Sequence, residues 1–176
     1  AEAVEKRLDM FCALPVDDVD DADELVEVML GSGADASLLE GLCDLLESIQ
    51  ESAGVVKVRE AILANVERRL GAESKEVGKA LFNLGLAYWH LGNSTKARDL
   101  LERALPIYER QCGNDHTEVA VVLNNLGNAY MGLGDYAKQR DVLERALPIK
   151  ERKHGKDSTQ VAITLTNLGN AYGDLG

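Results

Sequence analysis

A six-residue motif that recurs at a fixed interval constrains the fold of this chain more than any other feature. The sequence reads NLGLAY at residues 83–88, NLGNAY at 125–130 and NLGNAY again at 167–172. The interval is 42 residues both times, with no insertion between the copies. Self-similarity at one fixed period is typical of a solenoid, in which one structural unit is stacked on the next. The sequence therefore predicts a repeat architecture.

Within each interval, apolar residues recur at steps of three and four, which is typical of amphipathic helices. Glycine followed by a helix-capping side chain, as in Gly92 and Asn93, marks a turn between two helices. Each unit is therefore predicted to be a helix-turn-helix pair. The first helices are expected over residues 74–91, 117–133 and 158–174, and the second helices over 94–111 and 136–153.

A degenerate unit is predicted at the start of this array. Leu39 and Leu42 lie 42 residues before Leu81 and Leu84, so the preceding segment is in register with the clear repeats. An end unit of this kind would act as an N-terminal cap. The predicted domains are an acidic helical segment at 1–33, with short helices near 1–14 and 23–30, the capping unit at 34–75, with helices over 36–49 and 55–70, and the array at 76–176, with two full units and a half unit.

The formal net charge of -11 is unevenly distributed. Residues 1–53 hold 15 acidic and 2 basic side chains, whereas residues 54–176 hold 15 acidic and 17 basic ones. Neither part shows a basic stripe, so the sequence argues against nucleic-acid binding. The acidic part is expected to speed encounter with basic partner surfaces. Its acidic run at 17–24 lacks the glycine and glutamate spacing of a calcium loop, and we interpret it as a solvated loop.

Cysteine usage and hydropathy indicate where such a chain would work. Cys12, Cys43 and Cys112 lie far apart, without a Cys-x-x-Cys spacing. We interpret them as reduced thiols, which favours the cytoplasm or another reducing intracellular compartment. No metal site and no cofactor are expected. Apolar runs fall short of the roughly 18 residues that span a bilayer, so no membrane insertion is predicted.

The first helix of each unit has a packing face. Leu126 and Tyr130, with their neighbours at helical spacing, are predicted to face the second helix of the unit. Gly127 lies on the same face and lets the two helix axes approach closely. Gly85 and Gly169 are its equivalents.

The second helices carry two unusual features. Pro106 and Pro148 fall inside them, and we predict a kink rather than a stop because the apolar spacing continues past each proline.

These residues resemble the tetratricopeptide repeat, a helix-turn-helix unit. Leu126, Gly127, Tyr130 and Ala146 match its signature. The 42-residue period, with linkers GNDHTEVA at 113–120 and GKDSTQVA at 155–162, is similar to the longer variety found in kinesin light chains. The preceding unit matches at Leu84, Gly85, Tyr88, Ala97 and Ala104.

This resemblance covers residues 76–176 well and 34–75 weakly. It implies an all-α fold, a right-handed α-solenoid of stacked helix-turn-helix units with a helical N-terminal cap. One departure is Gln139, where the family usually has alanine, so the packing of that helix pair is less certain.

The resemblance also implies a concave groove lined by the other side of the first helices, and helical spacing indicates the same face. Phe82, Leu86 and Trp89 are expected to form an apolar anchor patch there. The predicted partner-binding residues are Lys79, Phe82, Asn83, Leu86, Trp89, Asn124, Asn125, Asn128, Met131, Asn167 and Asn170.

Amide side chains recur along this groove. A ladder of Asn83, Asn125 and Asn167 would suit the backbone of an extended peptide, because an amide both donates and accepts hydrogen bonds. Alternatively, the amides only tie adjacent helices together, and Trp89 packs against the helix over 36–49.

The groove's charge limits the ligand. Lys79 resembles part of the family's clamp for C-terminal carboxylates, but the further basic pair would fall at Ile163 and Asn167, which are not basic. The capping unit opposes Lys79 with acids such as Glu40 and Asp44. The partner is therefore expected to be a protein or peptide that is not strongly acidic.

The function expected from these features is a non-enzymatic protein-protein interaction scaffold or adaptor that binds its partner in the groove. No nucleophile with a positioned base is visible, and His90, His116 and His154 are isolated in the sequence, so no catalytic residue is predicted. The alternative is a structural accessory subunit of a larger assembly that docks through its convex face and ends. The start without methionine and the end inside a repeat favour that alternative.

The last first helix presents Leu165, Leu168 and Tyr172 with no second helix after it. An exposed apolar stripe of this kind marks an interface. Further repeats or a partner chain are expected to cover this C-terminal edge.

Overall fold

The computed structural model describes residues 36–48 and 52–176, which form seven α-helices and no strand. The predicted all-α fold is confirmed for these residues. The predicted helices near 1–14 and 23–30 and the acidic loop lie outside them. The chain divides into two compact units, Ala1–Arg69 and Leu70–Gly176, and each is described by itself. The division into 1–33, 34–75 and 76–176 stays a prediction.

In the first unit, the described residues form α3 (Ala36–Ser48) and α4 (Ser52–Leu70). Leu42 and Leu46 of α3 and Val58 of α4 are completely buried, as their helical spacing predicts. Arg59 Nη1 of α4 lies 3.7 Å from Glu40 Oε2 of α3. Glu40 therefore has a basic partner within its own unit.

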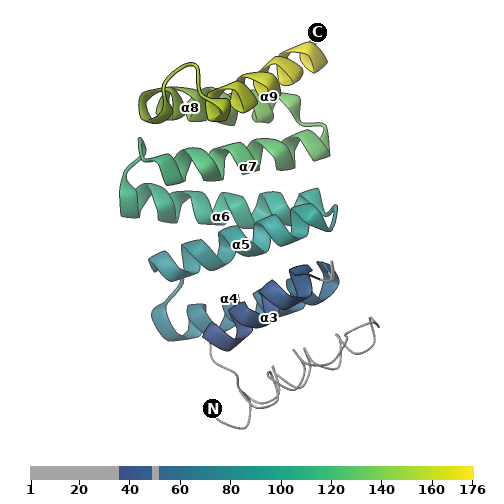
Figure 1. Ribbon diagram of the computed structural model, residues 1–176, viewed down its shortest axis with the longest axis vertical. Coiled ribbons are helices and arrows are strands. Elements are labelled where there is room, and N and C mark those ends of the chain that lie inside the picture. Colours follow the sequence, from purple (N-terminus) through teal and green to yellow (C-terminus); the bar gives the residue numbers. More distant parts are fainter. Residues whose placement is uncertain (1–35, 49–51) are drawn as a thin grey trace. The chain divides into compact units, whose positions relative to one another are not determined.

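The second unit consists of five helices that follow one another in chain order (Figure 1). Each helix packs against the next, and α5 also contacts α7, as α7 contacts α9. The predicted bounds differ from the observed ones by one residue at most. The helices are α5 (Lys75–His90), α6 (Ser94–Cys112), α7 (Thr117–Leu133), α8 (Tyr136–His154) and α9 (Thr159–Leu175).

Side-chain caps start these helices where the sequence predicts. Ser158 Oγ accepts a hydrogen bond from the Val161 amide at the start of α9, which satisfies an N–H that the helix itself leaves unpaired. Asn93 caps α6 in the same way through the Lys96 amide. Gly134 ends α7 in the left-handed conformation, with φ of 71°, which glycine adopts without steric cost.

Close approach of the two helices in each unit depends on glycine. A Cβ atom placed on Gly127 would lie 2.9 Å from Leu143 Cδ2, and one placed on Gly85 would lie 3.0 Å from Leu101 Cγ. Both distances leave no room for a methyl group, so the predicted packing role of these glycines is confirmed. Gly169 differs, because nothing lies within 4 Å of a Cβ atom built there.

The second helices continue through their prolines, so the prediction that proline does not stop them is confirmed. Pro106 lies inside α6 and Pro148 inside α8.

Gln139 lies inside α8 and is completely buried. Its Nε2 donates to the Asn167 carbonyl at 3.4 Å, while its Oε1 has no hydrogen-bond partner among the described residues. Its equivalent in α6, Ala97, is also completely buried and has no polar atom to satisfy. The irregularity predicted for this helix pair is thus a buried acceptor without a donor.

Tyrosine-glutamate contacts recur between units. The Tyr130 hydroxyl donates to Glu102, and the Tyr172 hydroxyl donates to Glu144, exactly one repeat later in role and register. Burial is the main cause that raises the pKa of Tyr130, followed by its bond to Glu102. These contacts join each second helix to the first helix that follows it.

Candidate binding surface

The eleven predicted partner-binding residues lie on α5, α7 and α9, which follow one another through the second unit. Lys79, Met131 and Asn170 are exposed, and the other eight are half-buried. Because α5 contacts α7 and α7 contacts α9, these side chains can form one strip across three helices. We call this set of eleven residues the strip.

The α5 part of the strip is mainly apolar and is supported from the second helix of its unit. The Phe82 ring meets the Tyr108 ring of α6 edge to face, with centroids 6.3 Å apart and planes at 69°. Tyr108 is half-buried, and burial is the main cause that raises the pKa of its hydroxyl. Phe82 is thereby held in place while part of its ring remains accessible.

Trp89, the only tryptophan of the sequence, lies where α5 meets α7. A Cβ atom on Gly132 of α7 would lie 3.0 Å from Trp89 Cζ3 and 2.2 Å from Ser94 Oγ. The indole therefore rests against the backbone of α7, where any side chain would displace it. The alternative contact with the helix over 36–49 involves both units and stays a prediction.

A pocket of ≈ 530 Å³ opens beside Trp89, at the turn between α5 and α6. Leu91 and Leu133 contribute apolar side chains that are 45% and 37% exposed. Its volume lies in the range of pockets that take small ligands or single side chains. It is lined by Leu91, Gly92, Asn93, Ser94, Thr95, Gly132 and Leu133.

The strip becomes polar between α7 and α9. Asn124 Oδ1 accepts hydrogen bonds from Lys150 Nζ of α8 and from the Thr164 hydroxyl of α9, both at 3.0 Å. Lys150 Nζ also donates to Thr164 Oγ1 at 2.9 Å. Lys150 is only 6% exposed, and burial lowers the pKa of its ammonium group. A buried cation is thus held by two neutral oxygens.

Other amides of the strip make local contacts. Asn167 Nδ2 donates to Asn128 Oδ1 at 3.2 Å, which joins α9 to α7. Asn125 Nδ2 donates to the Val121 carbonyl of its own helix at 2.9 Å. Part of the amide strip therefore ties neighbouring helices together, which is the alternative that the sequence left open. The Asn125 Oδ1 atom keeps its capacity to accept a hydrogen bond.

Sequence reasoning missed the residues that support the strip from below. Tyr108 and Lys150 lie on second helices and were not assigned to the strip, and neither was Thr164. A comparison at the 42-residue interval would have found two of them, because Phe82 and Tyr108 of one unit are replaced together by Asn124 and Lys150 of the next.

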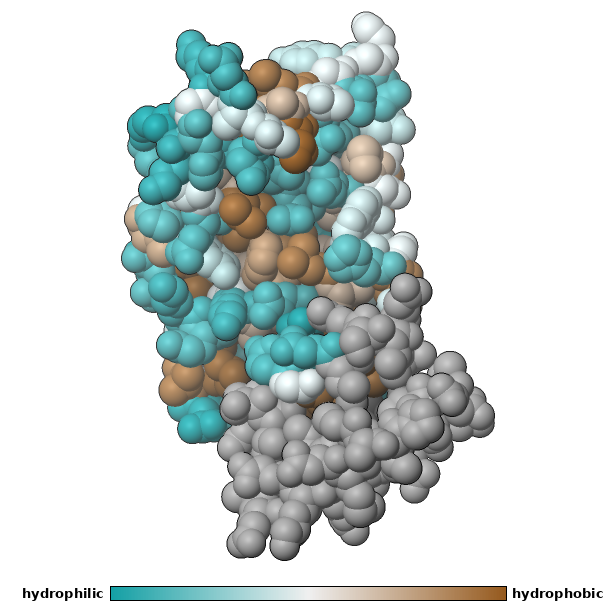
Figure 2. Space-filling model, in the orientation of Figure 1, coloured by the Kyte–Doolittle hydropathy of each residue, from teal (hydrophilic) through white to brown (hydrophobic). Residues whose placement is uncertain are grey.

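Large exposed apolar side chains form local groups. Leu91, Met131 and Leu133 lie at the ends of α5 and α7, and Ile163, Leu165, Tyr172 and Leu175 lie on α9. On the face that Figure 2 presents, hydrophobic residues of the described part form separate patches among hydrophilic ones. No helix of the described residues is long and apolar enough to cross a membrane.

A protein-family model described as tetratricopeptide repeat matches residues 56–110, 76–152 and 118–176. Together these matches cover more than half of the chain. The chain belongs to the tetratricopeptide repeat family. Such repeats form scaffolds for protein-protein interaction, so a protein partner is implied. No curated protein matches the sequence.

Solved structures agree with this assignment. A Podosopora anserina protein described as a kinesin light chain with nearly identical TPR-like repeats superposes with a TM-score of 0.71 at 20% identity, over 78% of this chain and 65% of that chain. BtubC (BKLC) from P. vanneervenii gives a TM-score of 0.71 at 25% identity, over 89% of this chain and 66% of that chain. The predicted similarity to kinesin-light-chain repeats is confirmed. This tetratricopeptide repeat chain spans about two thirds of each.

Proposed function

We propose that this tetratricopeptide repeat chain is a non-enzymatic scaffold that binds an extended segment of a partner protein along the strip. The observation that supports it most is the apolar α5 end, where Phe82, Leu86 and Trp89 are half-buried and the pocket at the α5–α6 turn opens beside Trp89. A few rigid aromatic anchors with polar surroundings are typical of binding hot spots.

The strip assigns different roles to its two ends. The α5 end would take apolar side chains of the partner, and Asn83, Asn125 and Asn170 would contact its backbone. Asn124, Asn128 and Asn167 already bond to neighbouring helices, so we assign them to positioning.

Charge defines the class of partner further. Lys79 is the exposed cation of the strip, whereas Lys150 is buried beneath it. A single exposed cation gives little attraction for a strongly acidic segment. We therefore propose a partner segment that is apolar and near neutral, met in the cytoplasm or another reducing compartment.

The test uses a partner isolated with the full chain from its source cells. Trp89→Ala and Asn125→Ala are each expected to weaken binding by about 1 kcal/mol or more, roughly fivefold in Kd. Their melting temperatures are measured alongside, because Trp89 also packs on α7. Tyr172→Ala is the matched control, since Tyr172 is an aromatic residue of α9 outside the strip. Binding that survives both strip changes in folded protein would refute the proposal.

A second candidate function is a structural subunit that docks through the α9 edge. Gly85 and Gly127 each face a leucine of the following helix, whereas Gly169 faces nothing within 4 Å. Leu165 and Tyr172 of α9 are 47% and 49% exposed. We propose that a helix presenting a leucine, from further repeats or a partner chain, covers this edge. In the binding test, loss of affinity with Tyr172→Ala alone would favour this function.

A further inference from the structure

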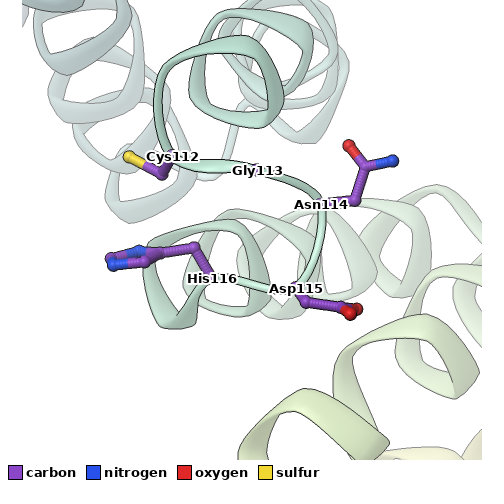
Figure 3. Close-up of a pocket in the computed structure, with 5 residues that line it drawn as sticks. All are labelled: Cys112, Gly113, Asn114, Asp115 and His116. Carbon is purple, nitrogen blue, oxygen red and sulfur yellow. The ribbon is translucent and has the colours of Figure 1, made fainter.

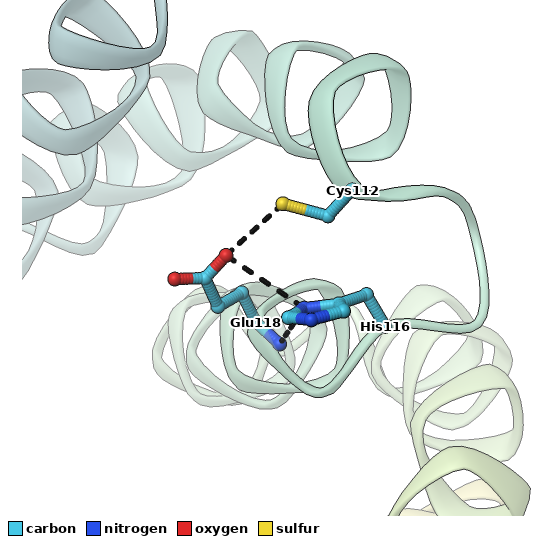
Figure 4. Close-up of side chains that lie close together, drawn as sticks. All are labelled: Cys112, His116 and Glu118. Atoms are coloured by element: carbon cyan, nitrogen blue, oxygen red, sulfur yellow. Dashed lines mark hydrogen bonds and ion pairs between the residues drawn. The ribbon is translucent and has the colours of Figure 1, made fainter.

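Three side chains with metal-binding donor atoms meet where α6 joins α7. Cys112 is the last residue of α6, His116 caps the start of α7, and Glu118 lies in its first turn. One donor atom from each residue lies within 4.8 Å of the other two. Cys112 Sγ donates to Glu118 Oε2 at 3.0 Å, and His116 Nδ1 lies 3.7 Å from the same oxygen (Figure 4). The sequence-based view of His116 as isolated is therefore wrong.

The repeat fold does not require this combination of residues. At the next junction, 42 residues later, the same positions hold His154, Ser158 and Gln160. Ser158 Oγ caps α9 through the Val161 amide, so a serine is sufficient for the structural role. His116 fills that role less typically, with Nδ1 accepting from the Glu118 amide at 3.2 Å.

The cluster is accessible from solvent. Figure 3 shows Cys112 and His116 pointing to one side of the linker, while Asn114 and Asp115 point to the other. The linker from Cys112 to His116 lines an open pocket of ≈ 780 Å³. The Cys112 and Glu118 side chains are half-buried and His116 is exposed, so the donors are held by the fold and still reachable.

The chemistry of the three donors limits the ion. A thiolate and an imidazole favour borderline and soft ions over Mg²⁺ or Ca²⁺, and a carboxylate completes a donor set that Zn²⁺ commonly uses. One thiolate and one carboxylate also balance the charge of a divalent ion. Lys75 is the nearby cation whose charge acts on the thiol, and it lies on α5.

We propose that Cys112, His116 and Glu118 bind one Zn²⁺ or a similar divalent transition-metal ion at the junction of α6 and α7. The ion replaces the thiol proton that Cys112 now donates to Glu118, and that proton is released to solvent. Three protein ligands leave one coordination position of a tetrahedral ion for water or for a donor group of another molecule. The site would join two consecutive repeats through their linker.

The test is titration of the metal-stripped full chain with Zn²⁺ by calorimetry and with Co²⁺ by absorbance. One ion per chain is expected, and Co²⁺ should give a thiolate charge-transfer band in the near ultraviolet. His116→Ser with Glu118→Gln copies the next junction and keeps a cap, and it is expected to weaken binding at least about tenfold. Cys112→Ser should abolish the charge-transfer band.

Two matched controls complete the experiment. Cys12→Ser and His154→Ser remove the same residue types elsewhere, and both variants are expected to bind Zn²⁺ as the natural chain does. Zn²⁺ should also raise the melting temperature of the natural chain and leave that of the double variant unchanged. The proposal is overturned by the absence of saturable binding in the natural chain, or by equal affinity in the His116→Ser, Glu118→Gln variant.

Discussion

The two complete repeats of the second unit, α5–α6 and α7–α8, share one packing frame but differ in the pair that supports the strip. Gly85 meets Leu101 in the first, as Gly127 meets Leu143 in the second. In the first repeat the supporting pair is aromatic, with Phe82 against Tyr108. In the second repeat Asn124 and Lys150 occupy the same positions and are hydrogen-bonded.

This difference shows which positions the fold fixes and which it leaves open. The glycine-leucine contacts set the distance between helices, so they recur without change. The supporting pair changes as a unit, because an apolar ring in place of Asn124 would deprive the buried Lys150 ammonium of an acceptor. The strip can thus be apolar in one repeat and polar in the next on the same frame.

The largest expected effect comes from exchanging half of a pair. Asn124→Phe alone should destabilise the chain by about 1.5–3 kcal/mol, because Lys150 loses a hydrogen bond to a buried charged group. Asn124→Phe with Lys150→Tyr and Thr164→Val copies the first repeat, where Val122 matches Thr164, and should recover most of the loss. Urea unfolding of each variant measures the coupling. Costs that simply add would show that the pair is not a unit.

The shared frame is tested by a matched pair of glycines. Gly127→Ala is expected to destabilise by about 1–3 kcal/mol, because the new Cβ would lie 2.9 Å from Leu143 Cδ2. Gly169→Ala meets nothing within 4 Å and should stabilise α9 by about 0.5–1 kcal/mol, since alanine favours helix more than glycine does. Thermal unfolding of both variants measures the difference, and equal effects would contradict the frame.

A smaller gain is expected at the position where the two repeats differ between Ala97 and Gln139. Gln139→Met keeps the volume and removes the buried Oε1 that lacks a partner. We expect stabilisation by about 1 kcal/mol, because an unsatisfied buried acceptor costs about that much or more. Denaturant unfolding measures it. A loss of stability would indicate that the Nε2 bond to the Asn167 carbonyl matters more.

The smallest expected effect is a difference in pH dependence between the supporting pairs. Burial lowers the pKa of Lys150 below its ordinary 10.5, so the cost of burying its charge is relieved as pH rises towards that value. Burial raises the pKa of Tyr108 above its ordinary 10.0, so its contribution is present below pH 10.0 and is lost above it.

The measurement compares unfolding free energies from pH 8 to about 11 for the natural chain, Lys150→Gln and Tyr108→Phe. The natural chain should gain stability relative to Lys150→Gln as pH rises, and should lose stability relative to Tyr108→Phe near the upper end. Parallel pH profiles for all three would contradict the assignment of these shifts to burial.

Periodicity made the array predictable, because the 42-residue interval places each helix, cap and packing glycine by comparison with its copies. The bounds of α5 to α9 and the contact of Gly127 with its neighbouring helix followed from this. The Lys150 network did not, because its members come from three helices and only the fold brings them together. The cluster at Cys112 was missed for the same reason, since helix ends and a linker meet there.

The candidate strip was predictable in position but only partly in role. Helical spacing placed Asn128 and Asn167 on the correct faces of their helices. Spacing does not say whether an amide points to a neighbour or to a ligand, and these two bond to each other. The contact of Trp89 with Gly132 depends on the distance between α5 and α7, which the sequence of either helix alone does not contain.

The emission of Trp89 during titration with the isolated partner tests the binding role of the strip most directly. Trp89 is the only tryptophan of this chain, so with a partner segment that lacks tryptophan its emission reports on the apolar end of the strip. We expect a saturable shift to shorter wavelength, with the same Kd as calorimetry, as the partner excludes water from the indole. Full binding with unchanged emission would contradict the account and place the partner on another surface.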